Sequence, residues 1–256
     1  MKITLLPSAV SAGAGARGFF SSSYLIDDAV AIDAGGLGFL GELDVQVRVE
    51  HIFITHSHMD HVASLPIFLE TVFQTRDRCV TLHCSQATLE SLRLDVFNDR
   101  VWPDFIGMSE KGLPFVKVQT IEADRPVDVA GLRFRPIAVD HVIPTLGFLI
   151  ESPGATVAIP SDTGPTEAFW RAASAAPNLK AIFLEASFPN AMEGLAVISK
   201  HLTPAMFAVE IHKLGRAVEC IAVHIKPRFY DAVVKELELL NLPNVRIGVP
   251  GENYIF

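Results

Sequence analysis

Short apolar runs alternate with segments of helical periodicity along the whole chain. β-branched and aromatic residues dominate the runs, which is typical of buried strands. The segments between them repeat apolar residues every three or four positions, as helices with one buried face do. This alternation predicts an α/β or α+β fold in which strands and helices are mixed throughout.

The predicted elements follow from these two periodicities and from Gly, Pro and Asp punctuation. Asp27 and Asp28 separate two of the strands, which indicates a hairpin. The strands are expected at residues 1–10, 22–26, 29–33, 51–55, 115–121, 132–139, 147–150, 156–159, 181–184 and 220–223. The helices are expected at residues 60–75, 166–174, 203–213 and 228–240.

Length and composition favour one domain. The chain has 256 residues, of which 50% are hydrophobic, so residues 1–256 can bury one large core. Its apolar runs are far shorter than the ~20 residues of a transmembrane helix, so no membrane association is expected. Cys79, Cys84 and Cys220 form no CxxC pair, which predicts reduced thiols and a cytoplasmic protein, with the periplasm less favoured.

The formal net charge of −8 opposes binding to long polyanions, because nucleic-acid affinity comes largely from Lys and Arg on phosphates. A small anion held by metal is still allowed. The stretch from Gly13 to Gly18 matches GxGxxG, but it leads into Phe19, Phe20 and a strand rather than a helix, so no dinucleotide site is expected.

The most informative polar segment follows the predicted strand 51–55. It places His56, His58, Asp60 and His61 within six positions. A single histidine in a loop is usually only solvated. Four potential ligands at a strand end instead favour a metal site, since imidazole and carboxylate groups bind Zn²⁺ and Fe.

Further ligands should also lie just past strands. His141, Asp162 and His224 each follow an apolar run, although alone Asp162 could cap a turn and a lone histidine could be structural. Together the residues predict one ion on His56, His58 and His141, another on Asp60, His61 and His224, and Asp162 between them. Two ions ~3.5–4 Å apart are typical of phosphoester or amide hydrolysis.

The order HxHxDH, His, Asp, His resembles the metallo-β-lactamase fold, a four-layer αβ/βα sandwich. Nearly the whole chain more closely resembles class II cyclic-nucleotide phosphodiesterases. Two departures, Met59 and Ala63-Ser64, touch no ligand. The matching blocks are residues 55–61 with Leu65-Pro66, 96–105, 161–165, 185–190, 201–204 and 224–227.

The resemblance implies hydrolysis of 3′,5′-cyclic AMP or cyclic GMP to nucleoside 5′-monophosphates by a hydroxide that bridges two divalent ions. Zn²⁺ is expected, with Mn²⁺ or Fe²⁺ as alternatives. Such ions lower the pKa of bound water toward ~7. Catalytic roles fall to Asp60, to His201 as proton donor to the leaving oxygen, and to Glu185, which orients or protonates His201.

Substrate contacts are expected from Asn98, Trp102, Thr163 and Thr203. The aromatic residues of segment 98–115 could stack a purine, but they could equally pack a homodimer interface or cover the core. His201 could also merely precede a helix that starts at Thr203-Pro204. The remaining histidines, His51, His83 and His212, are interpreted as structural.

Two rival functions remain open. A ribonuclease Z-like tRNA 3′-end endonuclease would share the metal ligands and the block from Glu185 to Phe188, but the acidic balance and the lack of a basic arm oppose it. The other is a non-catalytic metal-holding protein that acts as a cyclic-nucleotide sensor or partner-binding module. The fold alone does not decide, since it supports many chemistries.

Overall fold

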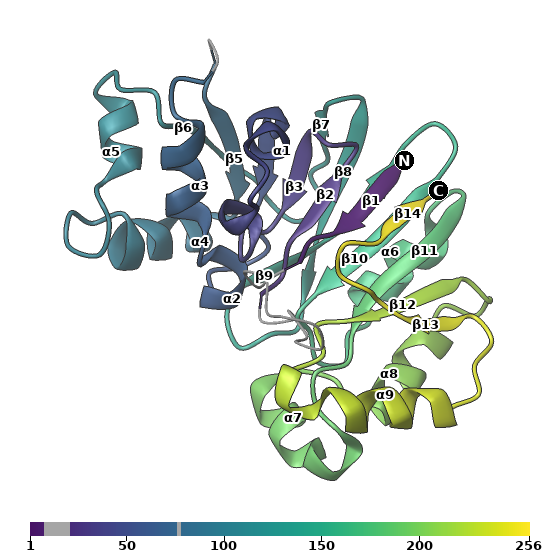
Figure 1. The fold of residues 1–256 in the computed structure, drawn as a ribbon. Coiled ribbons are helices and arrows are strands. Elements are labelled where there is room, and N and C mark those ends of the chain that lie inside the picture. Colours follow the sequence, from purple (N-terminus) through teal and green to yellow (C-terminus); the bar gives the residue numbers. More distant parts are fainter. Residues whose placement is uncertain (8–20, 76–77) are drawn as a thin grey trace. The chain divides into compact units, whose positions relative to one another are not determined.

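The computed structural model describes residues 1–7, 21–75 and 78–256, which form two compact units (Figure 1). The N-terminal unit contains residues 2–122 and 250–255. The C-terminal unit contains residues 123–249 together with Met1 and Phe256. Each unit is built on one seven-stranded mixed sheet.

The sheet of the N-terminal unit has the order β14-β1-β2-β3-β4-β5-β6. Pairing is antiparallel from β14 to β3 and parallel from β3 to β6. Asp27 and Asp28 have φ of 46° and 59°, and this left-handed backbone forms the tight turn between β2 and β3. The strands are β1 (Lys2–Leu5), β2 (Tyr24–Ile26), β3 (Val30–Ile32), β4 (His51–Phe53), β5 (Val80–Cys84), β6 (Val116–Thr120) and β14 (Asn253–Ile255).

Side chains of the helices and of the sheet form one buried hydrophobic cluster in this unit. Phe68 and Leu69 are fully buried in the same cluster as Ile52 of β4 and Leu82 of β5. The helices are α1 (Leu43–Arg48), α2 (Met59–Val62), α3 (Leu65–Val72), α4 (Gln86–Ser91) and α5 (Phe105–Glu110), with a 3₁₀ turn at Leu37–Phe39 and a π-helix at Leu92–Val96.

The sheet of the C-terminal unit has the order β13-β12-β11-β10-β9-β8-β7, parallel from β13 to β10 and antiparallel from β10 to β7. The strands are β7 (Val127–Val129), β8 (Leu132–Val139), β9 (Thr145–Glu151), β10 (Thr156–Ser161), β11 (Leu179–Glu185), β12 (Glu219–Val223) and β13 (Val245–Ile247). The helices are α6 (Ala168–Ala175), α7 (Glu193–Ser199), α8 (Pro204–His212) and α9 (Tyr230–Leu239), with 3₁₀ turns at Asn190–Met192 and Pro227–Phe229.

A second cluster forms the core of this unit. Trp170 of α6, Phe207 of α8 and Val233 of α9 are buried with Ile182 and Leu184 of β11. Burial of such large side chains stabilises a fold by about 1.5–3 kcal/mol each. The mixed α/β architecture predicted from the alternation of apolar runs and helical segments is therefore confirmed in both units.

Every predicted strand after residue 20 has a counterpart, and β1 lies within the predicted strand 1–10. The predicted helices 166–174, 203–213 and 228–240 correspond to α6, α8 and α9. Sequence periodicity missed the helices α1, α4, α5 and α7 and the strands β5, β7, β13 and β14. The GxGxxG stretch lies outside the described residues.

The prediction of one helix over residues 60–75 is wrong, because the chain forms α2 and then α3 with a break at Ala63 and Ser64. The backbone N–H and hydroxyl of Ser64 both donate to the carbonyl of Ala34, at 3.0 and 2.6 Å. Pro66 then occupies the first turn of α3, where a residue without an N–H is tolerated.

No helix within the described ranges is long and apolar enough to cross a bilayer. Cys79, Cys84 and Cys220 are free cysteines. Burial is the main cause that raises the pKa of Cys84 and of Cys220 to about 12, so both thiols stay protonated and unreactive.

Substitution of Gly35 tests a close backbone approach that holds the loop after β4. A Cβ at this position would lie 1.9 Å from the carbonyl oxygen of Asp60, which also accepts a 2.8 Å hydrogen bond from the N–H of Ser22. Gly35→Ala should lower the free energy of unfolding by about 1–3 kcal/mol through overpacking. In Gly41→Ala the new Cβ meets nothing within 4 Å, so this control should not be destabilised in urea unfolding. Equal stability of the two variants would contradict the tight packing.

The pH dependence of stability tests the buried His83. Its Nε2 lies 3.1 Å from Nδ1 of His51, and its ring stacks on Phe53. Burial, followed by the charges of His51 and Lys117, lowers the pKa of His83 from 6.5 to about 4. Between these values the unfolded chain binds more protons than the native protein, so stability should be lost as the pH falls from 6.5 to about 4, by up to about 1.4 kcal/mol per pH unit.

His83→Gln should flatten this loss in urea titrations at several pH values. The control His212→Gln changes an exposed histidine of α8 and should keep the dependence of the unsubstituted protein. Parallel curves for the two variants would mean that another group causes the loss.

Candidate metal and catalytic site

Most of the candidate residues follow strand ends. The segment from Thr55 to His61 begins just past β4 and leads into α2. His56 and His61 are buried, whereas His58 and Asp60 are half-buried. His58 precedes α2 in an extended conformation, and its carbonyl accepts the N–H of His61 at 2.9 Å. We call His56, His58, Asp60 and His61 the N-terminal half-site.

Asp33 orients this half-site, although sequence reasoning assigned it no role. It follows β3 with a left-handed φ of 60°. Its Oδ2 lies 2.6 Å from Nδ1 of His61, and its Oδ1 accepts the backbone N–H of Thr55 at 2.8 Å. Complete burial raises the pKa of Asp33, although the contacts with His61 and Thr55 favour its charged form. The carboxylate thus fixes both a ring and the backbone of the adjoining loop.

These contacts determine which ring nitrogen carries the lone pair. Asp33 accepts, so Nδ1 of His61 carries the proton. The Thr55 hydroxyl donates to Asp33 at 3.0 Å and therefore accepts from Nδ1 of His56 at 2.9 Å. Both histidines then carry the lone pair on Nε2, and Nε2 of His56 lies 3.0 Å from Nδ1 of His58. Such fixing of one nitrogen is how proteins prepare a histidine to bind a metal.

His141 follows β8 in the C-terminal unit and is held in the same way. Its Nδ1 lies 3.0 Å from the carbonyl oxygen of Lys200, so Nε2 again carries the lone pair. Lys200 adopts a left-handed φ of 52° at the end of α7, and its Nζ donates to Asp140 at 2.6 Å. The dipeptides Asp140-His141 and Lys200-His201 are thus joined by two contacts.

Asp162 and His224 follow β10 and β12. Oδ2 of Asp162 lies 3.2 Å from Nε2 of His224. Ser161 and His224 have left-handed φ of 63° and 54°. This conformation is costly for residues other than glycine, and such residues cluster at functional sites.

Glu185 and His201 form a buried pair beside Asp162. Oε1 of Glu185 lies 2.7 Å from Nδ1 of His201, and the potential ligand atoms of Asp162, Glu185 and His201 lie within 4.8 Å of one another. Burial alone would lower the pKa of His201. The charge and hydrogen bond of Glu185, with a smaller effect of Asp162, outweigh burial and raise that pKa.

Three further donors hold the Glu185 carboxylate. They are the N–H of Thr163 at 2.9 Å, the hydroxyl of Ser187 at 2.7 Å and the N–H of Leu202 at 3.2 Å. Glu185 is only 1% exposed, so every direction of its carboxylate is determined by the protein. We call His141, Asp162, Glu185, His201 and His224 the C-terminal half-site.

The donors fit a divalent metal ion. Imidazole nitrogens with a fixed tautomer and carboxylate oxygens are the ligand set of Zn²⁺ and similar ions, and both half-sites offer them. Asp33 and Lys200 supply the outer hydrogen bonds that such ligands need. The chain therefore carries His and Asp groups able to bind metal.

Most of the expected substrate contacts have side chains engaged within the fold. Asn98 donates to the carbonyl of Leu94 and accepts two backbone N–H groups of the following turn. Thr203 caps α8, and Thr163 donates to the carbonyl of Gly164. Trp102 is half-buried against the N-terminal core, and its buried Nε1 has no hydrogen-bond partner among the described residues.

One signal could have revealed Asp33 from the sequence. It directly follows an apolar run, as His224 does. Its place before a Gly-rich loop instead suggested the end of a strand. The role of Lys200 was not accessible in this way, because its backbone carbonyl makes the contact with His141.

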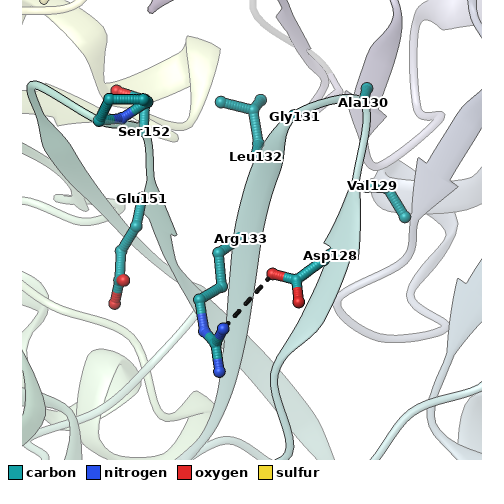
Figure 2. A pocket seen from close by; sticks show the side chains of 9 residues that line it. Asp128, Val129, Ala130, Gly131, Leu132, Arg133, Glu151 and Ser152 are labelled. Carbon is teal, nitrogen blue, oxygen red and sulfur yellow. Dashed lines mark ion pairs between the residues drawn. The ribbon is translucent and has the colours of Figure 1, made fainter.

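A separate hollow of about 490 Å³ lies at the β7, β8 and β9 end of the C-terminal sheet (Figure 2). Its charged side chains are Asp128, Arg133 and Glu151. Asp128 and Arg133 form a 3.6 Å ion pair and are both more than half exposed. The hollow contains no histidine or cysteine, so it lacks the chemistry of the two half-sites.

Comparison with known proteins agrees with this chemistry. A probable 3′,5′-cyclic-nucleotide phosphodiesterase of Yersinia pestis is 27% identical over 238 residues, which cover 83% of this chain and 65% of that protein. A ribonuclease Z of Kineococcus radiotolerans is 34% identical over 125 residues, 46% of this chain and 38% of that protein. The chain thus spans less than two thirds of either relative.

Unliganded yeast PDE1 superposes with a TM-score of 0.79 at 18% identity and covers 98% of both chains, which shows the fold alone. The predicted metallo-β-lactamase fold is thereby confirmed. The model of the beta-lactamase superfamily domain matches residues 36–225, which contain both half-sites. On this match over most of its length, the chain belongs to the beta-lactamase superfamily.

Proposed function

We propose that this protein is a metal-dependent phosphodiesterase that hydrolyses 3′,5′-cyclic nucleotides to nucleoside 5′-monophosphates. The buried Glu185-His201 pair beside Asp162 carries the proposal, because it places a candidate proton donor, His201, next to Asp162, a candidate metal ligand. The Yersinia pestis relative, named a probable 3′,5′-cyclic-nucleotide phosphodiesterase, supports the substrate class.

The two half-sites together are proposed to hold two divalent ions. His56, His58 and His141 would bind one ion, Asp60, His61 and His224 the other, and Asp162 both. Zn²⁺ suits this mixture of imidazole and carboxylate donors, with Mn²⁺ or Fe²⁺ as alternatives. When bound, such ions supply an activated water and neutralise charge at phosphorus.

The residues of the chain then perform the proton transfer. Attack of the activated water would form a new P–O bond and break the bond from phosphorus to the 3′ oxygen, and this leaving oxygen needs a proton. His201 would donate it from Nε2, because Nδ1 is committed to Glu185. Glu185 keeps the imidazole protonated and correctly turned, and Ser187, Thr163 and Leu202 keep Glu185 in place.

Trp102 remains a proposed base contact. Effects of Asn98, Thr163 and Thr203 on substrate would be indirect, through the loops that their side chains hold. We further propose a cytoplasmic location, which the three free thiols favour, and a homodimer as an alternative role for the aromatic segment.

Ribonuclease Z-like cleavage of tRNA is the rival activity, and the match to the Kineococcus radiotolerans enzyme favours it. That match covers 46% of this chain, and the net charge of −8 opposes a long polyanion. A non-catalytic sensor is less well supported, because a sensor has no use for a buried proton donor such as His201.

A substrate panel tests the proposed function. Purified, metal-quantified protein offered cyclic AMP, cyclic GMP and a pre-tRNA side by side should release 5′-monophosphates from a cyclic nucleotide and leave the pre-tRNA intact. Two metals per chain with no turnover of any substrate would favour the non-catalytic sensor, and tRNA cleavage would favour the rival nuclease.

Variants of the proton donor test the mechanism. His201→Gln should lower kcat about 10²–10⁴-fold, the usual contribution of general acid catalysis, while metal content stays unchanged. Glu185→Gln should also lower kcat, since it weakens the hydrogen bond that orients His201 and removes the charge that keeps it protonated. His212→Gln serves as the control because His212 is exposed on α8. Unchanged turnover in His201→Gln would remove this residue from the mechanism.

A further inference from the structure

Lys226 lies within the C-terminal half-site. It comes two residues after His224, and its Nζ lies 2.8 Å from Nε2 of that histidine. Its backbone N–H donates to the carbonyl of Ser187 at 3.4 Å, and Pro227 directly afterwards begins a 3₁₀ turn. The base of the side chain is therefore anchored to the same segment that positions Glu185.

The ammonium group has a strongly charged environment. Nε2 of His224, which Lys226 contacts, is also 3.2 Å from Asp162, and Asp162 is 4.0 Å from Nδ1 of His201. The charge of Lys226 is also felt at His201, where it opposes the effect of Glu185. Lys226 is thus half-buried and part of the chemical centre of this unit.

The contact with His224 has a consequence for the metal-bound protein. An ammonium group only donates, so it approaches the lone pair on Nε2 of His224. The same lone pair would bind an ion, and one lone pair does not serve both. Binding of an ion by His224 would therefore release the ammonium from Nε2, while the anchored backbone would keep it within a side-chain length of the site.

We propose that Lys226 then binds a non-bridging oxygen of the phosphodiester and is a further catalytic residue, an inference that rests on the proposed function. Attack at phosphorus adds negative charge to these oxygens. Asp162 would offset part of the charge of an ion, so a further cation nearby would stabilise the added negative charge. An ammonium whose backbone is already anchored at the site meets this need.

The test uses the metal-loaded 256-residue protein and inorganic phosphate as the probe. Lys226→Met keeps the aliphatic stem but lacks the charge, Lys226→Arg keeps the charge, and Lys235→Met changes an exposed lysine of α9 as the matched control. The measurements are metal content, phosphate affinity by calorimetry, and kcat and KM on cyclic AMP or cyclic GMP, whichever the protein hydrolyses.

Lys226→Met should retain its metal, bind phosphate at least about tenfold more weakly and lose about 10²–10³-fold in kcat, as expected for removal of one charge-stabilising group. Lys226→Arg should recover most of both losses, and Lys235→Met should resemble the unsubstituted protein. Unchanged phosphate affinity in Lys226→Met would overturn the proposal. Loss of metal in that variant would also overturn it, because Lys226 would then act only by holding His224.

The phosphate measurement separates this inference from the proposed function. If the unsubstituted protein hydrolyses no cyclic nucleotide but its phosphate affinity depends on Lys226, the phosphodiesterase proposal fails and the phosphate contact stands. If it hydrolyses cyclic nucleotides while its phosphate affinity is independent of Lys226, the phosphodiesterase proposal stands and the proposed phosphate contact of Lys226 fails.

Discussion

An imidazole ring offers a metal only one nitrogen, and the other must be held if the ring is to point in a fixed direction. This constraint explains much of the structure around the candidate site. Asp33 holds His61, Thr55 holds His56, and the carbonyl of Lys200 holds His141, in each case through Nδ1. Three unrelated partners, a carboxylate, a hydroxyl and a backbone carbonyl, thus satisfy the same chemical requirement.

The partners impose further demands on the backbone. Asp33, Ser161, Lys200 and His224 all adopt left-handed φ next to or within the half-sites. For residues with a side chain this conformation costs on the order of 1 kcal/mol or more, so the surrounding hydrogen bonds must maintain it. Glu185 illustrates how, since its donors come from the segments that follow β10 and β11 and from the approach to α8. The hydrogen-bond network thus maintains the strained backbone conformations around the site.

The sequence allowed the candidate ligands to be selected because each occupies a recognisable position. His141, Asp162 and His224 lie within two residues of the end of an apolar run, and these runs form β8, β10 and β12. The helix expected over residues 60–75 failed for a different reason. Periodicity does not register a tertiary hydrogen bond such as that from Ser64 to Ala34, which breaks the helix. Contacts made by backbone atoms, as by Lys200, are equally invisible in a sequence because any residue type supplies them.

Charge links the site to folding. The chain is acidic overall, and it buries Asp33, Asp162 and Glu185. Burying a carboxylate is costly unless donors or cations accompany it. In the C-terminal half-site these cations are His201 and Lys226, so the protein folds with its own positive groups near the position proposed for an ion. A divalent ion would replace part of this internal compensation, and metal affinity would be reduced by the free energy needed to displace Lys226. The same displacement would deliver a cation toward the substrate, so a cost in metal affinity and a gain in phosphate binding arise from one side chain.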